Sequence, residues 1–195
     1  MKRHQRHGVY HIGSSLLKFS NFRDWAVTNP ELPLEFTTST IKILGTDGRI
    51  TDHFNPFLGY HFHPIHPSFD AEFQVFPTTL RCPSSDTSTA RSQPNMVKTS
   101  LRRTNYKDFI WRLYSRAADW DTFSNQARIN ARVSGPINSL ENPHGSIHLA
   151  VGGMPDDGLD ASGHMTPPTV SSFDPIFWLH HCAVDRFLVT SYFKV

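Results

Sequence analysis

Twelve histidines and only two cysteines occur in this chain of 195 residues, so imidazole chemistry is the first to consider. His144 and His148 are four positions apart, and on a helix this spacing places both rings on one face. His181 follows in a later helical segment. If the two segments pack together, three neutral nitrogens converge, and such a set suits copper or zinc. Gly145 stands where a zinc protease of the HExxH type has its glutamate, which disfavours that class.

Other histidines are weaker candidates for a metal site. His63 and His66 each precede a proline, which disfavours helical structure there. His4, His7 and His11 are spaced at helical intervals but lie in a terminal segment that we expect to be irregular. We therefore place the metal site at the later histidines.

The elements that must position these histidines are two helices with similar starts. Asn142 and Asp174 are each followed by proline, a pattern that predicts an N-cap with proline at the first helical position. The first helix is expected to end at Gly152-Gly153, and an earlier first turn, near Ser139, is the alternative start. The second is expected to run through His181.

The rest of the sequence predicts a mainly α fold with minor β-structure and long loops. Apolar residues recur at helical spacing over 105–117, and a second short helix is expected around 120–128. The stretch 37–44 is rich in β-formers and stops at a turn over 45–48. In 84–100, 8 of 17 residues are Ser or Thr, so we expect a surface loop.

Composition and charge exclude several classes of partner. Lys and Arg total 19 against 17 Asp and Glu, so the chain has no strong positive electrostatic field that would attract nucleic acid. The sequence contains no run of about 18 apolar residues, the length that would predict a membrane span. It also contains no signal-peptide pattern, so we expect an intracellular, cytoplasmic protein. Cys82 and Cys182 permit one disulfide, but we expect two buried thiols. The sequence does not determine the oligomeric state.

Two stretches resemble the copper-B motifs of tyrosinases and related phenol oxidases. The first is NSLENPHGSIHLAVGG, residues 138–153, and the second combines GHM at 163–165 with FDPIFWLHHCAVDR at 173–186, in a form similar to fungal members. The likeness covers roughly residues 22–190. It implies an irregular segment, 1–21, followed by a partial tyrosinase copper-binding domain, 22–195, built as a helical bundle with long loops.

The resemblance implies a ligand set. His144, His148 and His181 match the copper-B ligands, whereas His180 matches the neighbour that is not a ligand. His164, in the GHM stretch, is expected to be structural and to meet the backbone.

Other site residues follow from the same resemblance. Glu141 matches a glutamate that holds a water near the coppers, and Phe177 matches an aromatic gate above copper B. Gly145 stands where many monophenol-hydroxylating members have asparagine, so we expect it to influence the choice of substrate. Asp185 and Arg186 match the helix end that supports the site, or else form a solvated ion pair.

The implied activity is O₂-dependent oxidation of phenols and o-diphenols to o-quinones. That reaction uses two coppers, because reducing O₂ takes two electrons and each Cu(I) supplies one. The sequence contains no stretch like the copper-A ligand segment, so we expect a truncated chain with copper B alone. The alternative is a non-catalytic, mononuclear metal-binding remnant. An O₂ carrier of the molluscan haemocyanin type shares the motifs, but the GHM stretch argues against it.

Overall fold

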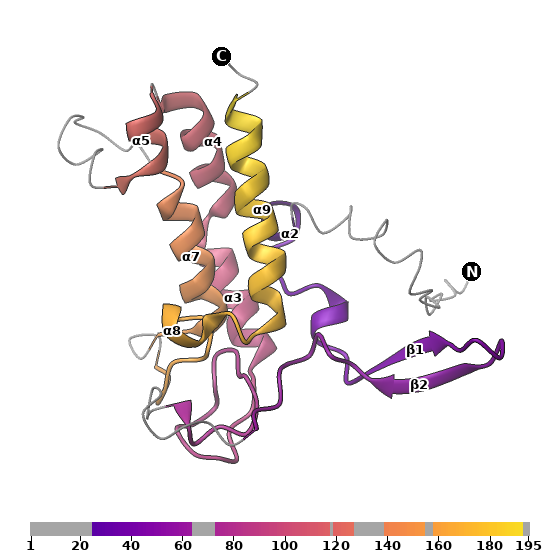
Figure 1. Ribbon diagram of the computed structural model, residues 1–195. Coiled ribbons are helices and arrows are strands. Elements are labelled where there is room, and N and C mark those ends of the chain that lie inside the picture. The colour runs from indigo at the N-terminus through magenta and orange to yellow at the C-terminus, as the bar shows by residue number, and fades with distance from the viewer. Residues whose placement is uncertain (1–24, 64–72, 118, 127–138, 155–157, 193–195) are drawn as a thin grey trace, which may run out of the picture.

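The computed structural model describes residues 25–63, 73–117, 119–126, 139–154 and 158–192. The expected irregular segment 1–21, with its histidines, and His66 lie outside these residues. Helices stand side by side, and a two-stranded hairpin projects away from them (Figure 1). The elements in chain order are α2 (Trp25–Thr28), the 3₁₀ helix η2 (Leu34–Phe36), β1 (Thr40–Leu44), β2 (Ile50–Phe54), α3 (Pro94–Thr104), α4 (Tyr106–Arg116), α5 (Trp120–Ser124), α7 (Glu141–Gly152), α8 (Pro168–Ser171) and α9 (Pro175–Tyr192). The prediction of a mainly α fold is confirmed.

Two of the predicted helices form close to where apolar spacing placed them. α4 spans Tyr106–Arg116 and buries Leu113 completely. α5 spans Trp120–Ser124, and its start is capped by Asp119, whose Oδ1 accepts a hydrogen bond from the backbone N–H of Thr122 at 2.8 Å. Local periodicity and capping were therefore sufficient here.

The Ser/Thr-rich stretch 84–100 is a loop only as far as Gln93, so its last part was predicted wrongly. From Pro94 onward it is helix α3, which begins with proline in its first turn. Val97 and Leu101 lie four positions apart and are both buried. Burial of this narrow apolar stripe outweighs the weak helix preference of the surrounding Ser and Thr residues.

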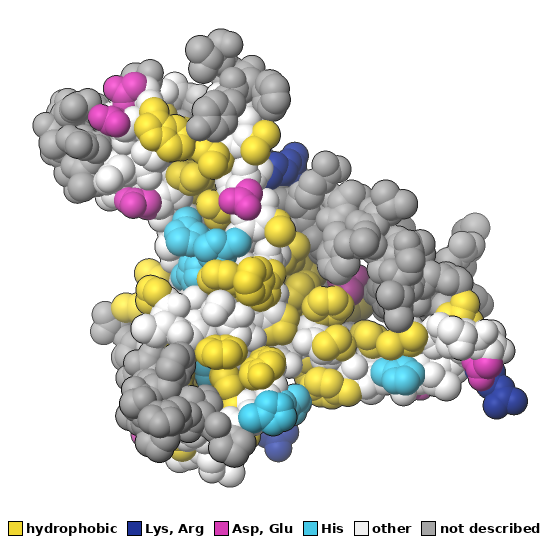
Figure 2. Space-filling model, in the orientation of Figure 1, with side chains coloured by type: hydrophobic (Ala, Val, Ile, Leu, Met, Phe, Trp, Pro, Cys, Tyr) yellow, Lys and Arg dark blue, Asp and Glu magenta, His cyan; other side chains and the backbone are white. Residues whose placement is uncertain are grey.

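The β-rich stretch forms one strand of an antiparallel hairpin. β1 pairs with β2 in a register that sets Thr40 opposite Phe54 and Leu44 opposite Ile50. The turn between them has Gly48 at φ +77°, a conformation that favours glycine. The hairpin presents hydrophobic side chains beside polar ones on the face drawn in Figure 2.

The two site helices begin differently. Asp174 is the N-cap of α9 as predicted, because its Oδ1 accepts from the N–H of Ile176 at 3.1 Å. Asn142 is not the N-cap of α7, since that helix already begins at Glu141. Its Oδ1 instead accepts from the N–H of Ser139 at 3.0 Å, within the first turn. α7 ends at Gly152 as predicted.

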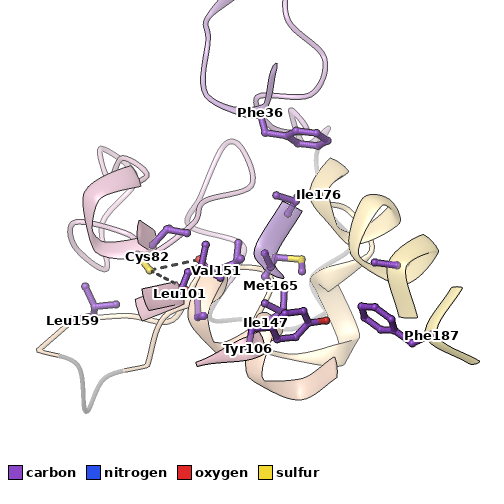
Figure 3. Close-up of a cluster of buried hydrophobic side chains, with 14 residues drawn as sticks. Phe36, Cys82, Leu101, Tyr106, Ile147, Val151, Leu159, Met165, Ile176 and Phe187 are labelled. Atoms are coloured by element: carbon purple, nitrogen blue, oxygen red, sulfur yellow. Dashed lines mark hydrogen bonds between the residues drawn. The ribbon is translucent and has the colours of Figure 1, made fainter. Parts of the chain in front are cut away.

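The core lies where α3, α4 and α9 pack against α7. Side chains from all four helices and from the loop before α8 meet there; they include Leu101, Tyr106, Ile147, Val151, Met165, Ile176 and Phe187 (Figure 3). Burying one such side chain contributes roughly 1.5–3 kcal/mol. Cys82 is a buried thiol as expected, but Cys182 is exposed, so the prediction that it is buried was wrong. Within the described ranges, no helix has both the length and the hydrophobicity to cross a bilayer.

A buried ion pair fixes the start of α9. Arg81 and Asp174 are 3% and 0% exposed at their side chains, and Nη2 lies 2.6 Å from Oδ1. Arg81 Nη1 also donates to the carbonyl of Phe36, and Nη2 to that of Phe57. The guanidinium thus ties the segments before and after the hairpin to the helix that carries His181.

Candidate metal centre

The three predicted ligands lie together between α7 and α9. His144 and His148 occupy successive turns of α7, with ring centroids 4.8 Å apart. His181 on α9 places its Nε2 3.4 Å from Nε2 of His144 and 3.3 Å from Nε2 of His148. Histidine side chains gather over these two helices beside hydrophobic ones (Figure 2). The structure therefore brings together side chains 37 residues apart in the chain.

The spacing of these nitrogens fits one metal ion. Imidazole nitrogen binds zinc at about 2.0–2.1 Å, and two such bonds at a tetrahedral angle separate the nitrogens by about 3.3–3.4 Å. The distances from Nε2 of His181 to the other two Nε2 atoms agree with that value. The donors are three neutral imidazoles without thiolate or carboxylate, which is a set that suits copper or zinc.

His180 is the alternative third ligand. Ring nitrogens of His144, His148 and His180 lie within 4.8 Å of one another. His180 is 1% exposed, its ring stacks on that of His144, and its Nε2 lies 3.0 Å from the backbone oxygen of His144. A carbonyl only accepts, so this nitrogen carries a proton and donates it. Nε2 of His181 faces both other Nε2 atoms, whereas Nε2 of His180 is taken by the carbonyl, so His181 stays the predicted ligand and His180 its predicted support.

A backbone carbonyl orients His148. Nδ1 of His148 lies 2.7 Å from the carbonyl oxygen of Met165, so Nδ1 must carry the proton. In a neutral ring this leaves the lone pair on Nε2, the atom that faces His181. Such a partner on the far nitrogen is characteristic of metal-binding histidines.

Burial keeps these imidazoles neutral. Loss of solvent lowers the pKa of His144 to about 4, helped by the nearby rings of His148 and His181. Burial also lowers the pKa of His148 and of His181, and it lowers that of His180 well below its ordinary value. At neutral pH the ring nitrogens therefore have lone pairs available for a metal.

Aromatic side chains border the histidines on α9. Phe177, one turn before His181, stacks on its ring at 3.9 Å between centroids. It also contacts the edge of His148. The next residue, Trp178, is 62% exposed and meets Phe177 edge-on. The predicted aromatic gate thus lies against two of the three candidate ligands.

Glu141 and Gly145 lie on the same helix as His144. The charge of the Glu141 carboxylate raises the pKa of His144, against the larger effect of burial. Its Oε2 accepts from the N–H of Gln126 at 2.8 Å. A Cβ added at Gly145 would meet no atom within 4 Å, so a side chain fits there. The roles implied for these two residues stay predictions.

The other sequence candidates have different surroundings. His164 is completely buried, and its Nδ1 accepts from the N–H of Leu80 at 2.9 Å, which confirms a structural role. His61, two residues before the weaker candidate His63, contacts the ring of Phe54 at the base of the hairpin. The charge of Asp185 raises the pKa of His181, against the larger effect of burial.

Two groups that contribute to the site were not predicted from the sequence. The carbonyl of Met165 carries no residue-type signal, because any residue has one; only its place beside His148 matters. The pairing of Arg81 with Asp174 spans 93 positions, and neither residue alone indicates the other. An acidic residue capping a helix was the only signal available.

Comparisons with known proteins agree with the motifs. The sequence model for the common central domain of tyrosinase matches residues 21–190. The tyrosinase of Neurospora crassa is 35% identical over 181 residues, which cover 84% of this chain and 24% of that protein. Polyphenol oxidase 3 of Agaricus bisporus is 32% identical over 149 residues, covering 76% of this chain and 25% of that protein.

A solved structure shows the same fold at comparable identity. The crystal structure of latent and active mushroom tyrosinase superposes with a TM-score of 0.70 at 32% identity. The match covers 85% of this chain and 28% of that one. The chain thus spans about a quarter of the length of the relatives it matches.

Proposed function

This chain belongs to the tyrosinase family, and from that premise we propose that it forms the copper-B half of a phenol oxidase, with His144, His148 and His181 as the ligands. The observation that carries the proposal is the approach of Nε2 of His181 to both other Nε2 atoms, at 3.3 and 3.4 Å. Family membership favours copper among the metals that suit three imidazoles.

The proposed reaction is the oxidation of phenols and o-diphenols to o-quinones with O₂. The name of the Agaricus relative, a polyphenol oxidase, supports this substrate class. Copper, when bound, supplies the electron transfer between the phenol and O₂. Among the residues with a described position, one group of three or more candidate ligands occurs, so we propose one copper for each chain.

The chain's own residues hold the ligands and position the substrate. Donation from Nδ1 of His148 to Met165 keeps the ligand nitrogen unprotonated. The ring of Phe177 offers an apolar face on which a phenol ring can stack beside His181. The exposed carboxylate of Glu141 holds a water that takes the phenol proton.

Copper titration of the metal-free full chain tests the site. We expect about one tightly bound copper for each chain, and at least a tenfold loss of affinity in His148→Ala and in His181→Ala. His53→Ala is the matched control, because His53 is exposed on the hairpin. Two tightly bound coppers, or equal affinity in all three variants, would overturn the ligand assignment.

Oxygen uptake with catechol tests the reaction. The copper-loaded chain is compared with a complemented form, in which histidine ligands for a copper A are also present. Uptake in the second form that is lost in His181→Ala supports the catalytic proposal. Stoichiometric copper binding without uptake in either form identifies the non-catalytic, mononuclear alternative.

A further inference from the structure

Three segments of the chain meet at the end of α7. The carbonyl oxygen of Gly152 accepts hydrogen bonds from the N–H of Cys82 at 3.0 Å and from that of Gly163 at 2.9 Å. Oγ1 of Thr166 donates to the carbonyl of Gly153 at 2.8 Å. These bonds fasten the loop 163–166 to the helix that carries His144 and His148.

The close approach of these segments requires two glycines. A Cβ on Gly152 would lie 2.1 Å from Oγ1 and 2.5 Å from the backbone N of Thr166. A Cβ on Gly163 would lie 2.5 Å from the carbonyl oxygen of Leu80. A real Cβ atom essentially never comes within 3.0 Å of such neighbours, so side chains here would push the loop away from α7.

His164 pairs with Leu80 through both its side chain and its backbone. Its Nδ1 accepts from the N–H of Leu80 at 2.9 Å, and its own N–H donates to the carbonyl of Leu80 at 3.0 Å. The ring is completely buried among Phe62, Phe73 and Phe76, with centroid distances of 4.9–5.7 Å.

The hydrogen bonding fixes the tautomer of His164. Because Nδ1 accepts, the proton of the neutral ring is on Nε2, and this nitrogen has no hydrogen-bond partner among the residues that the structure describes. Burial lowers the pKa of His164 to about 4, so the ring is neutral at pH 7. Of the two ring nitrogens, Nε2 therefore makes no hydrogen bond to the described residues, and Nδ1 keeps its hydrogen bond to Leu80.

The residue after His164 supplies the carbonyl that orients His148. Met165 is completely buried, and its oxygen lies 2.7 Å from Nδ1 of His148. We propose that His164 is a positioning residue: by pairing with Leu80 it holds the carbonyl of Met165 on Nδ1 of His148, so that Nε2 presents its lone pair to the metal. The expected effect on copper affinity rests on the proposed function. The tautomer of His148 does not, because it can be measured in the metal-free chain.

Nitrogen NMR of the metal-free full chain tests the positioning directly. We expect wild-type His148 to be neutral with its proton on Nδ1. His164→Leu fills much of the ring's volume but leaves the N–H of Leu80 without an acceptor. In this variant we expect a mixture of His148 tautomers and copper affinity about 10–100-fold weaker.

His164→Asn is the conservative variant, because Oδ1 of asparagine occupies the place of Nδ1 and accepts from Leu80. We expect it to keep the wild-type tautomer and to bind copper within about threefold of wild type. Leu113→Ala is the control for general destabilisation, since Leu113 is buried on α4. We expect it to lower the unfolding midpoint without changing the tautomer of His148.

The outcomes separate this inference from the proposed function. A wild-type His148 with its proton on Nε2 would overturn the positioning role even if no variant folds. His164→Leu with wild-type tautomer and affinity would also overturn it. If the wild type binds no copper but the tautomer responds to His164→Leu and not to His164→Asn, the metal proposal fails and the positioning role stands.

Discussion

The ring of Phe177 lies nearly parallel to the imidazole of His181, with centroids 3.9 Å apart and planes inclined by 28°. The two residues are one turn apart on α9, so the helix itself brings the rings together. A stack uses the faces of the rings and neither nitrogen of the imidazole. It therefore orients His181 while leaving Nε2 available to a metal.

Replacing Phe177 should weaken metal binding. We expect Phe177→Leu to lower copper affinity about two- to tenfold, because aromatic pairs contribute about 0.5–1.5 kcal/mol beyond simple burial. The measurement is competition against a chelator of known affinity. Trp178→Leu removes the neighbouring exposed aromatic residue and should leave the affinity unchanged. Equal affinities in the two variants would show that the stack does not orient His181.

Removing the charge of Asp174 should strongly destabilise the fold. Asparagine still caps a helix, so Asp174→Asn leaves α9 its N-cap but leaves the buried guanidinium of Arg81 without a counter-charge. We expect a loss of about 3–5 kcal/mol in the free energy of unfolding, measured with urea.

The control for Asp174→Asn is an exposed ion pair. Lys42 and Asp52 lie 2.9 Å apart across the hairpin, with both side chains about half exposed. Asp52→Asn should cost less than about 1 kcal/mol. A similar cost for both substitutions would mean that burial of the Arg81 pair does not determine its contribution.

Acid should destabilise the metal-free chain partly through His164. Its pKa is about 4 in the folded state against 6.5 for an ordinary histidine, so the unfolded chain takes up the proton first as the pH falls. The stability that this group contributes is complete above about pH 6.5 and is lost as the pH falls towards about 4. The difference of about 2.5 pH units corresponds to about 3 kcal/mol.

Urea unfolding at pH 7 and at pH 4 measures this effect. Wild type should lose about 2–3 kcal/mol more than His164→Asn between the two pH values, because asparagine does not titrate. Parallel losses in the two proteins would show that His164 is not the group responsible.

Gly145 should influence which phenols are oxidised. In a form supplied with copper-A ligands, we expect good oxidation of o-diphenols and poor hydroxylation of monophenols. Glycine offers no amide to help Glu141 polarise the water that takes the phenol proton, and a catechol depends less on that base. The open space at Gly145 admits an asparagine. One charge-assisted hydrogen bond is worth about 1.5–3 kcal/mol, so Gly145→Asn should raise the ratio of monophenol to diphenol turnover roughly ten- to a hundredfold.

Gly145→Ala is the matched control for that ratio. Alanine fits the same open space and offers no hydrogen-bond donor, so its ratio should equal that of glycine. A ratio that is the same in all three proteins would show that this position does not set the substrate preference.

Local sequence was enough to place the helices that carry the site. The spacing of His144 and His148 and the glycine stop at Gly153 depend only on helical periodicity and backbone dihedral angles. The cap at Asp174 involves atoms two residues apart. The resemblance to the family motifs then predicted which histidines are the ligands, and that assignment stays a prediction.

Tertiary packing overruled local preference elsewhere. The last residues of the Ser- and Thr-rich stretch, from Pro94 onward, form α3 because Val97 and Leu101 are buried in the core. The prediction of an N-cap at Asn142 was wrong for a local reason: the backbone is already helical at Leu140, and the amide oxygen of Asn142 accepts from the N–H of Ser139, three residues back.

The orientation of the ligands was decided only by the tertiary structure. Helical spacing shows that His180 and His181 point in different directions, but only the packing of α9 on α7 puts Nε2 of His180 on the carbonyl of His144 and Nε2 of His181 near the other two Nε2 atoms. The carbonyl of Met165 on His148 depends on how a loop packs against α7. Such contacts join segments far apart in the chain, and their energies depend on burial and on precise distances, which no local pattern encodes.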